Sequence, residues 1–173
     1  MFYRITLRFF FIKTILWDII LIIRVDYVNE MLKKLLEVFI MDEFKDIRWK
    51  QRFENFNKAY KLLEKYSTKT KLSELEQAGI IQFFEMTFEL GWKVLKDYLE
   101  SDGYIVKSPR ETIKQAFQNE IINDGHIWMD ALAVRNLTTH TYDENLANKM
   151  VNDILNIYFP ELKKMHDRLE KEV

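Results

Sequence analysis

Residues that turn or break a chain are scarce in this sequence. Its 173 residues include 4 Gly and 2 Pro, whereas average usage is about 7% Gly and about 5% Pro. A β-sandwich or barrel needs turn signals roughly every 8–12 residues, so these folds are excluded. The glycines are too far apart for a Gly-rich phosphate loop, at positions 79, 91, 103 and 125. The sequence therefore predicts an all-α fold.

Composition narrows the class of protein further. Hydrophobic residues make up 48% and charged residues 31% of the chain, which is typical of a packed protein. A net charge of −1 excludes a global basic surface for duplex nucleic acid, although a local nucleic-acid site stays open. The absence of cysteine excludes disulfides, cysteine zinc sites and thiol nucleophiles, and is consistent with a cytoplasmic location.

The first 40 residues differ from the rest of the chain. Residues 9–23 read FFFIKTILWDIILII, an apolar run that Lys13 and Asp18 interrupt. A membrane span needs about 20 mostly uncharged residues, and a central charge costs roughly 2.5–3.5 kcal/mol. A span is therefore not expected, and the lack of a small-residue cleavage site also argues against a signal peptide.

Our hypothesis for this break in composition is a later start of translation. Met41 opens the polar stretch MDEFKDIRWKQRF, which leads directly into a regular helix pattern, and Met31 is the other internal candidate. We expect residues 1–40 to be an apolar extension that the fold does not need, and residues 41–173 to form a helical domain.

Apolar residues recur at helical spacing through this domain. A first helix is predicted over about 45–66. A capping box of Ser73 and Glu76 begins a second helix, which ends near residue 100 at Asp102-Gly103. The first stripe, spaced by four and three residues, consists of Trp49, Phe53, Phe56, Tyr60 and Leu63.

Further start and stop signals define the remaining helices. Ser108, Pro109 and Glu111 begin a third helix, predicted to reach about Ile122. A fourth is predicted over about 126–138, with Trp128 and Leu132 facing inward. Thr141 and Glu144 form a capping box for a fifth, in which Pro160 introduces a kink or begins a short sixth helix. These elements predict an antiparallel helical bundle.

Most titratable residues have structural interpretations. His126 and His166 are expected on the solvated surface, and neither has metal-ligand spacing, so no metal or other cofactor is expected. Glu85 and Glu89 share a helix face, but Lys93 continues the same series. A solvated Glu–Lys ladder is therefore favoured over a catalytic carboxylate pair.

His140 differs because of the residues around it. Asn136 and His140 share a helix face with Arg135 on its flank, and the threonine-rich end of the helix favours a turn that brings Tyr142 back to them. Arg binds a phosphate through two hydrogen bonds, and His titrates near neutral pH. The alternative is a helix C-terminus where Arg and His are favourable cations.

The segment Arg135-x4-His140-x-Tyr142 matches the R-x4-H-x-Y signature of the HEPN superfamily, with Asn136 as the polar residue after the arginine. Residues 83–99, 108–117 and 135–144 resemble its nucleotidyltransferase substrate-binding protein family, the HepT-like partners of minimal nucleotidyltransferases encoded by an adjacent gene. The resemblance covers about residues 46–170. It implies an up-and-down bundle of four or five helices that forms a homodimer.

The resemblance also implies an activity. Many HEPN proteins are metal-independent endoribonuclease toxins, which implies His140 as general acid or base, Arg135 as the stabiliser of phosphorane charge, and Asn136 as an orienting group. It implies Tyr142 as the acceptor of nucleotide units that silence the site. Two alternatives stay open: a non-catalytic subunit that presents substrate to the nucleotidyltransferase, and a purely structural helical dimer.

Overall fold

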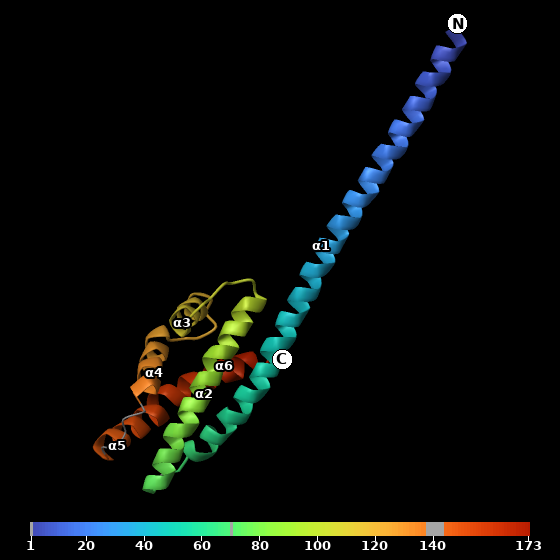
Figure 1. The fold of residues 1–173 in the computed structure, drawn as a ribbon. Helices are drawn as coiled ribbons and strands as arrows, with labels where there is room; N and C mark the ends of the chain where they lie inside the picture. Colours follow the sequence, from blue (N-terminus) through green and yellow to red (C-terminus); the bar gives the residue numbers. More distant parts are fainter. Residues whose placement is uncertain (1, 70, 138–143) are drawn as a thin grey trace. The chain divides into compact units, whose positions relative to one another are not determined.

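The computed structural model describes residues 2–69, 71–137 and 144–173, with side chains from residue 24 onward except at 137 and 144. All regular elements in these residues are helices, so the predicted all-α class is confirmed (Figure 1). The chain divides into two compact units, residues 1–43 and residues 44–173. The predicted bundle lies in the second unit.

Helix α1 (Phe2–Ser67) is longer than the predicted helix. The prediction began near residue 45, but no Gly or Pro occurs between Phe2 and Ser67 to end the helix earlier. The large apolar side chains between Val25 and Met41 are exposed in their own unit. Within the described part of the chain, no helix is long and apolar enough to cross a membrane.

Helix α2 (Glu74–Ser101) begins and ends where the sequence predicts. The Ser73 side chain accepts from the Glu76 N–H, and the Glu76 carboxylate accepts from the Ser73 N–H at 3.0 Å, which completes the capping box. At the other end Gly103 adopts φ +87°. The Tyr104 N–H donates to the Leu99 carbonyl and the Gly103 N–H to the Glu100 carbonyl, which is a Schellman motif.

Helix α3 (Pro109–Gln118) begins as predicted but ends earlier. The chain leaves the helix through Glu120, at φ +55°, and the Ile121 N–H donates to the Ala116 carbonyl at 2.8 Å. This turn buries Ile121 and Ile122, whose side chains a continued helix would have placed on different faces. Burial of two isoleucines outweighs the strain of one left-handed Glu.

Helix α4 (Gly125–Leu137) follows directly. The Asp124 carboxylate accepts from the N–H groups of His126 and Ile127, at 2.9 and 3.0 Å, and so caps the first turn. Trp128 and Leu132 are buried, as predicted.

The last helical rod contains a π-helical turn. Helix α5 (Glu144–Asp153) continues through η2 (Ile154–Tyr158) into α6 (Phe159–Leu169). Pro160 lies in the first turn of α6 and has no N–H to donate to a carbonyl four residues back. The wider η2 turn accommodates this missing bond, so Pro160 begins a sixth helix instead of only bending the fifth.

The core is aromatic and brings α1, α2 and α6 together. Phe56 of α1 lies close to Gly91 of α2, where an added Cβ would be 3.3 Å from the Phe56 ring and 3.6 Å from Leu162 of α6. The absence of a side chain at Gly91 therefore permits the close approach of these helices.

The prediction for His166 was wrong, because this residue is in the core. The residue is 5% exposed, and its ring stacks on Tyr60 with the ring centroids 4.1 Å apart. Its Nε2 lies 3.0 Å from the Asn57 side-chain oxygen, so the polar edge is paired. The charged sequence neighbours indicated a solvated helix, but the position of His166 on α6 faces the aromatic stripe of α1. His126 is exposed, as predicted.

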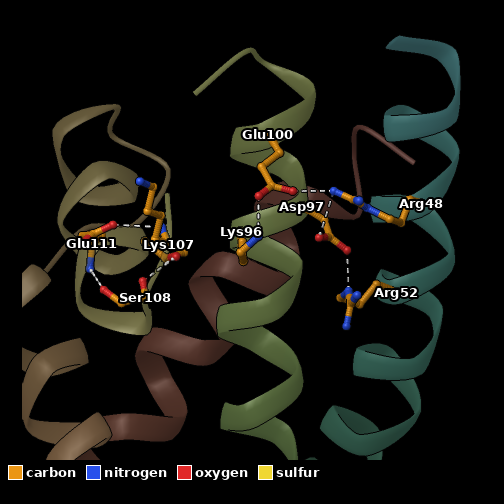
Figure 2. A network of polar contacts seen from close by, with 9 residues as sticks. Arg48, Arg52, Lys96, Asp97, Glu100, Lys107, Ser108 and Glu111 are labelled. Carbon is orange, nitrogen blue, oxygen red and sulfur yellow. Dashed lines mark hydrogen bonds and ion pairs between the residues drawn. The ribbon is translucent and has the colours of Figure 1, made fainter. Parts of the chain in front are cut away.

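A charged network also joins α1 to α2 (Figure 2). The buried Asp97 carboxylate accepts from Arg52 Nε at 2.5 Å and lies 3.3 Å from Arg48. Arg48 also contacts Glu100, which pairs with Lys96 on its own helix. These cations are already paired with carboxylates, so the network links helices and does not form a free basic surface.

Candidate functional site

Arg135 lies in the last turn of α4, on the side that faces α2. It follows Trp128 and Ala131 at intervals of seven and four residues, and both of these side chains are buried. The helical repeat therefore carries the apolar face of α4 to its end and places a guanidinium there. The Arg135 side chain is 38% exposed, so it is anchored on one side and open to solvent on the other.

Two described side chains contact the Arg135 guanidinium. Glu89 Oε2 on α2 lies 2.9 Å from Arg135 Nη2. The Asn136 side-chain oxygen accepts from Arg135 Nη1 at 3.1 Å. Arg135 and Asn136 are thus in contact with each other.

Glu89 is held by three donors. In addition to Arg135, Trp92 Nε1–H donates to Glu89 Oε2 at 3.1 Å and Lys93 Nζ lies 2.8 Å from Oε1. Burial opposes ionisation, but the hydrogen bonds from Lys93 and Trp92 and the charge of Arg135 outweigh it, so the pKa of Glu89 is below its usual value. Glu89 is therefore ionised at neutral pH.

The sequence prediction for Glu89 was incomplete. Its pair with Lys93 is present, but the same carboxylate also reaches Arg135, 46 positions along the chain. No local spacing signals this contact, because it depends on how α4 packs on α2. Glu85, the other member of the predicted carboxylate pair, is partly buried one turn earlier on α2.

The other two predicted site residues, His140 and Tyr142, lie outside the described residues. Thr141 of the predicted capping box lies there as well. The described part of the candidate site is therefore Arg135, Asn136 and Glu89, with Lys93 and Trp92 behind Glu89.

This arrangement is suited to an anion. Lys93 balances the charge of Glu89, so the cluster retains the positive charge of Arg135. An oriented guanidinium offers directed N–H donors that match the geometry of a phosphate.

One group of metal-ligating side chains occurs among the described residues. Ligand atoms of His166, Asp167 and Glu170 lie within 4.8 Å of one another. Both His166 ring nitrogens are already within hydrogen-bond distance of Asn57 and Asp167, and His166 stacks in the aromatic core. The group is therefore explained by packing.

Comparisons with solved structures identify the class of fold. The tri-AMPylated Shewanella oneidensis HEPN toxin in complex with an MNT antitoxin aligns with a TM-score of 0.56 and 15% identity, over 71% of this chain and 96% of that one. A mutant of the MntA–HpeT toxin–antitoxin aligns with a TM-score of 0.59 and 13% identity, over 71% and 97%. At these identities the likeness establishes the fold, which is that of a HEPN protein.

The sequence comparisons identify the family. Residues 51–171 match the model of the family described as nucleotidyltransferase substrate binding protein like. The chain belongs to this family. A protein of Thermus thermophilus, known from its crystal structure, is 32% identical, with a TM-score of 0.62, over 66% of this chain and 98% of that one.

A curated relative carries a functional name. The "Probable ribonuclease HepT" of Haemophilus influenzae is 32% identical over 75 residues, which are 40% of this chain and 51% of the relative. The match therefore spans about half the length of that relative.

Proposed function

We propose that this protein is the HEPN toxin of a two-component toxin–antitoxin system, and that it cleaves RNA without a metal ion. The observation that carries the proposal is the oriented Arg135–Asn136 pair at the end of α4, at the start of the R-x4-H-x-Y signature. The ribonuclease name of the Haemophilus influenzae relative supports it.

The proposed reaction uses the ribose as the nucleophile. His140 removes the proton of the 2′-OH, and the 2′-oxygen attacks the adjacent phosphorus. The bond from phosphorus to the 5′-oxygen breaks, and that oxygen takes up a proton. The products are a 2′,3′-cyclic phosphate and a free 5′-OH. Arg135 stabilises the additional negative charge on the phosphorane, and Asn136 orients Arg135 or the phosphate. The required 2′-OH restricts the substrate to RNA.

The partner is proposed to be a minimal nucleotidyltransferase encoded by an adjacent gene. It adds nucleotide units to Tyr142 and so silences the site. The antitoxin complexes among the structural neighbours support this partner. An RNA-cleaving toxin acts where RNA and its partner are present, so we expect a cytoplasmic location. We expect a homodimer because the family resemblance implies one.

Expression of the chain alone tests the toxin activity. We expect slowed growth and RNA cleavage in EDTA, both lost in His140→Ala and strongly reduced in Arg135→Ala. Full-rate cleavage by His140→Ala would remove that residue from the mechanism. His126→Ala, at an exposed histidine on the same helix as Arg135, is the matched control and should cleave normally.

Labelled ATP tests the silencing step. When both proteins are incubated with it, we expect label on this chain at Tyr142, mapped by peptide mass spectrometry, and loss of cleavage. Label at another residue with Tyr142 unmodified would reject the assignment.

The family description favours a second candidate, a non-catalytic subunit that presents substrate to the nucleotidyltransferase. In that case the purified pair transfers nucleotides only when this chain is present, and the chain alone leaves RNA intact. The same two experiments therefore separate the candidates.

A further inference from the structure

We propose that Glu89 is a positioning residue that holds the Arg135 guanidinium in the orientation needed to bind the scissile phosphate. This inference rests on the function proposed above and adds to it a residue from a different helix, outside the R-x4-H-x-Y signature. It starts from the 2.9 Å contact between Glu89 Oε2 on α2 and Arg135 Nη2 on α4.

Glu89 is itself well fixed, as a positioning group must be. Trp92 and Lys93 hold it from the following turn of α2, at 3.1 and 2.8 Å. Next to it on the helix, Phe88 is 1% exposed and packs on Trp128 of α4, with the ring centroids 5.5 Å apart. The backbone beneath Glu89 is therefore part of the rigid α2–α4 contact.

Glu89 orders Arg135, and not the reverse, because Arg135 lies at a helix end. A long side chain in the last turn has many rotamers. If substrate binding had to select one of them, the lost conformational entropy would oppose binding. Glu89 and Asn136 engage Nη2 and Nη1, respectively, so the guanidinium plane is set in advance. Such preorganisation is most valuable where charge develops in the transition state.

Charge balance permits this role. A carboxylate next to an anion-binding arginine repels the anion, unless another cation compensates the charge of that carboxylate. Lys93 lies on the oxygen of Glu89 that does not contact Arg135, so it compensates that charge without occupying the guanidinium.

A plain structural tie between α2 and α4 is the competing role, and kinetics with Glu89→Gln distinguish the two. We expect kcat on a short RNA oligonucleotide to fall about 10- to 100-fold, with little change in KM. In an Arg135→Ala background, Glu89→Gln should cause no further loss, because it acts through Arg135. Glu85→Gln, one turn earlier on the same helix, is the matched control and should leave kcat unchanged.

A second readout does not depend on RNA cleavage. The ¹⁵N–¹H heteronuclear NOE of the Arg135 Nε–H, assigned from its loss in Arg135→Lys, reports how strongly the guanidinium is held. We expect a high value in the native chain and in Glu85→Gln, and a clearly lower value in Glu89→Gln.

Several outcomes would overturn the inference. They are an unchanged kcat in Glu89→Gln, a loss that adds fully to that of Arg135→Ala, and an unchanged NOE. If the native chain cleaves no RNA, the proposed ribonuclease function fails, and the NOE alone still decides whether Glu89 orders Arg135.

Discussion

The imidazole of His166 behaves as a core aromatic ring with one polar edge. It stacks on Tyr60 and lies 5.5 Å from the ring of Phe53, centroid to centroid. The Asn57 side chain satisfies its Nε2 at 3.0 Å. Histidine combines the flat surface of an aromatic residue with the capacity to bond the half-buried Asn57 amide, which neither Phe nor Leu supplies.

Removal of this ring should therefore be costly. We expect His166→Ala to lower the free energy of unfolding by about 2–4 kcal/mol, because it leaves a cavity and an unpaired amide. His126→Ala, at an exposed histidine, should change it by less than about 0.5 kcal/mol. Urea unfolding followed by circular dichroism measures both, and equal effects would contradict the core role.

At the scale of elements, most helix ends are determined by local hydrogen bonds. The capping box at Ser73 and the Schellman motif at Gly103 are each complete within a few residues. The end of α3 depends instead on the burial of Ile121 and Ile122 in the core. The π-helical turn η2 directly precedes Pro160, which has no N–H to donate.

Two glycines of the α2 region form a matched pair for substitution. An added Cβ would have open space at both Gly79 and Gly103, but only Gly103 has a positive φ, of +87°. We expect Gly103→Ala to destabilise the protein by about 1 kcal/mol and Gly79→Ala, within the helix, to stabilise it by up to about 1 kcal/mol. Thermal unfolding would show opposite shifts of Tm. A Tm of Gly103→Ala equal to that of the native chain would contradict the assignment of a left-handed cap at Gly103.

The capping box of α2 should also make stability depend on acid pH. Hydrogen bonds from Lys69, and from the backbone and side chain of Ser73, lower the pKa of Glu76 to about 2. A carboxyl with a folded pKa below its unfolded value of about 4.3 contributes stability above that pH and loses it as the pH falls toward 2. Glu76→Gln lacks this contribution.

Urea midpoints measured at several pH values test this. At pH 7 the urea midpoint of the native chain should be higher than that of Glu76→Gln. The difference between the two midpoints should narrow below about pH 4.3. Glu74→Gln, in the same helical turn, is the control. A constant gap for Glu76→Gln across the acid range would show that the charge of Glu76 does not support the cap.

At the scale of the whole molecule, the division into residues 1–43 and 44–173 matters most. In the second unit, Trp49 stacks edge-on against Tyr98 with the centroids 5.1 Å apart, and Arg52 binds the buried Asp97. The part of α1 from about residue 46 onward therefore belongs to the folded core. We propose that residues 1–40 are not required for folding.

Truncation tests this proposal. A chain that begins at Met41 should unfold cooperatively, with a free energy within about 1 kcal/mol of the full chain. A chain that begins at Phe53 should lose several kcal/mol, because Trp49 is removed and Asp97 loses both arginines. Aggregation or non-cooperative unfolding of the Met41 chain would contradict the proposal. The intact mass of the natively produced protein shows where translation begins.

The sequence by itself determined the all-α class, the starts of α2 and α3, the end of α2 and the buried faces of Trp128 and Leu132. The helix ends depend on caps and glycines that bond only to sequence neighbours, and the apolar spacing within one helix shows which face of that helix is buried.

Only the tertiary structure decided the burial of His166, the early end of α3 and the contact of Glu89 with Arg135. Each depends on packing against another part of the chain: His166 packs on α1, Ile121 and Ile122 pack in the core, and Glu89 contacts Arg135 of α4. Helical periodicity shows which residues share a face, but it does not show which helix that face meets. The scarcity of Gly and Pro therefore predicts long helices, and the packing of those helices places the candidate site.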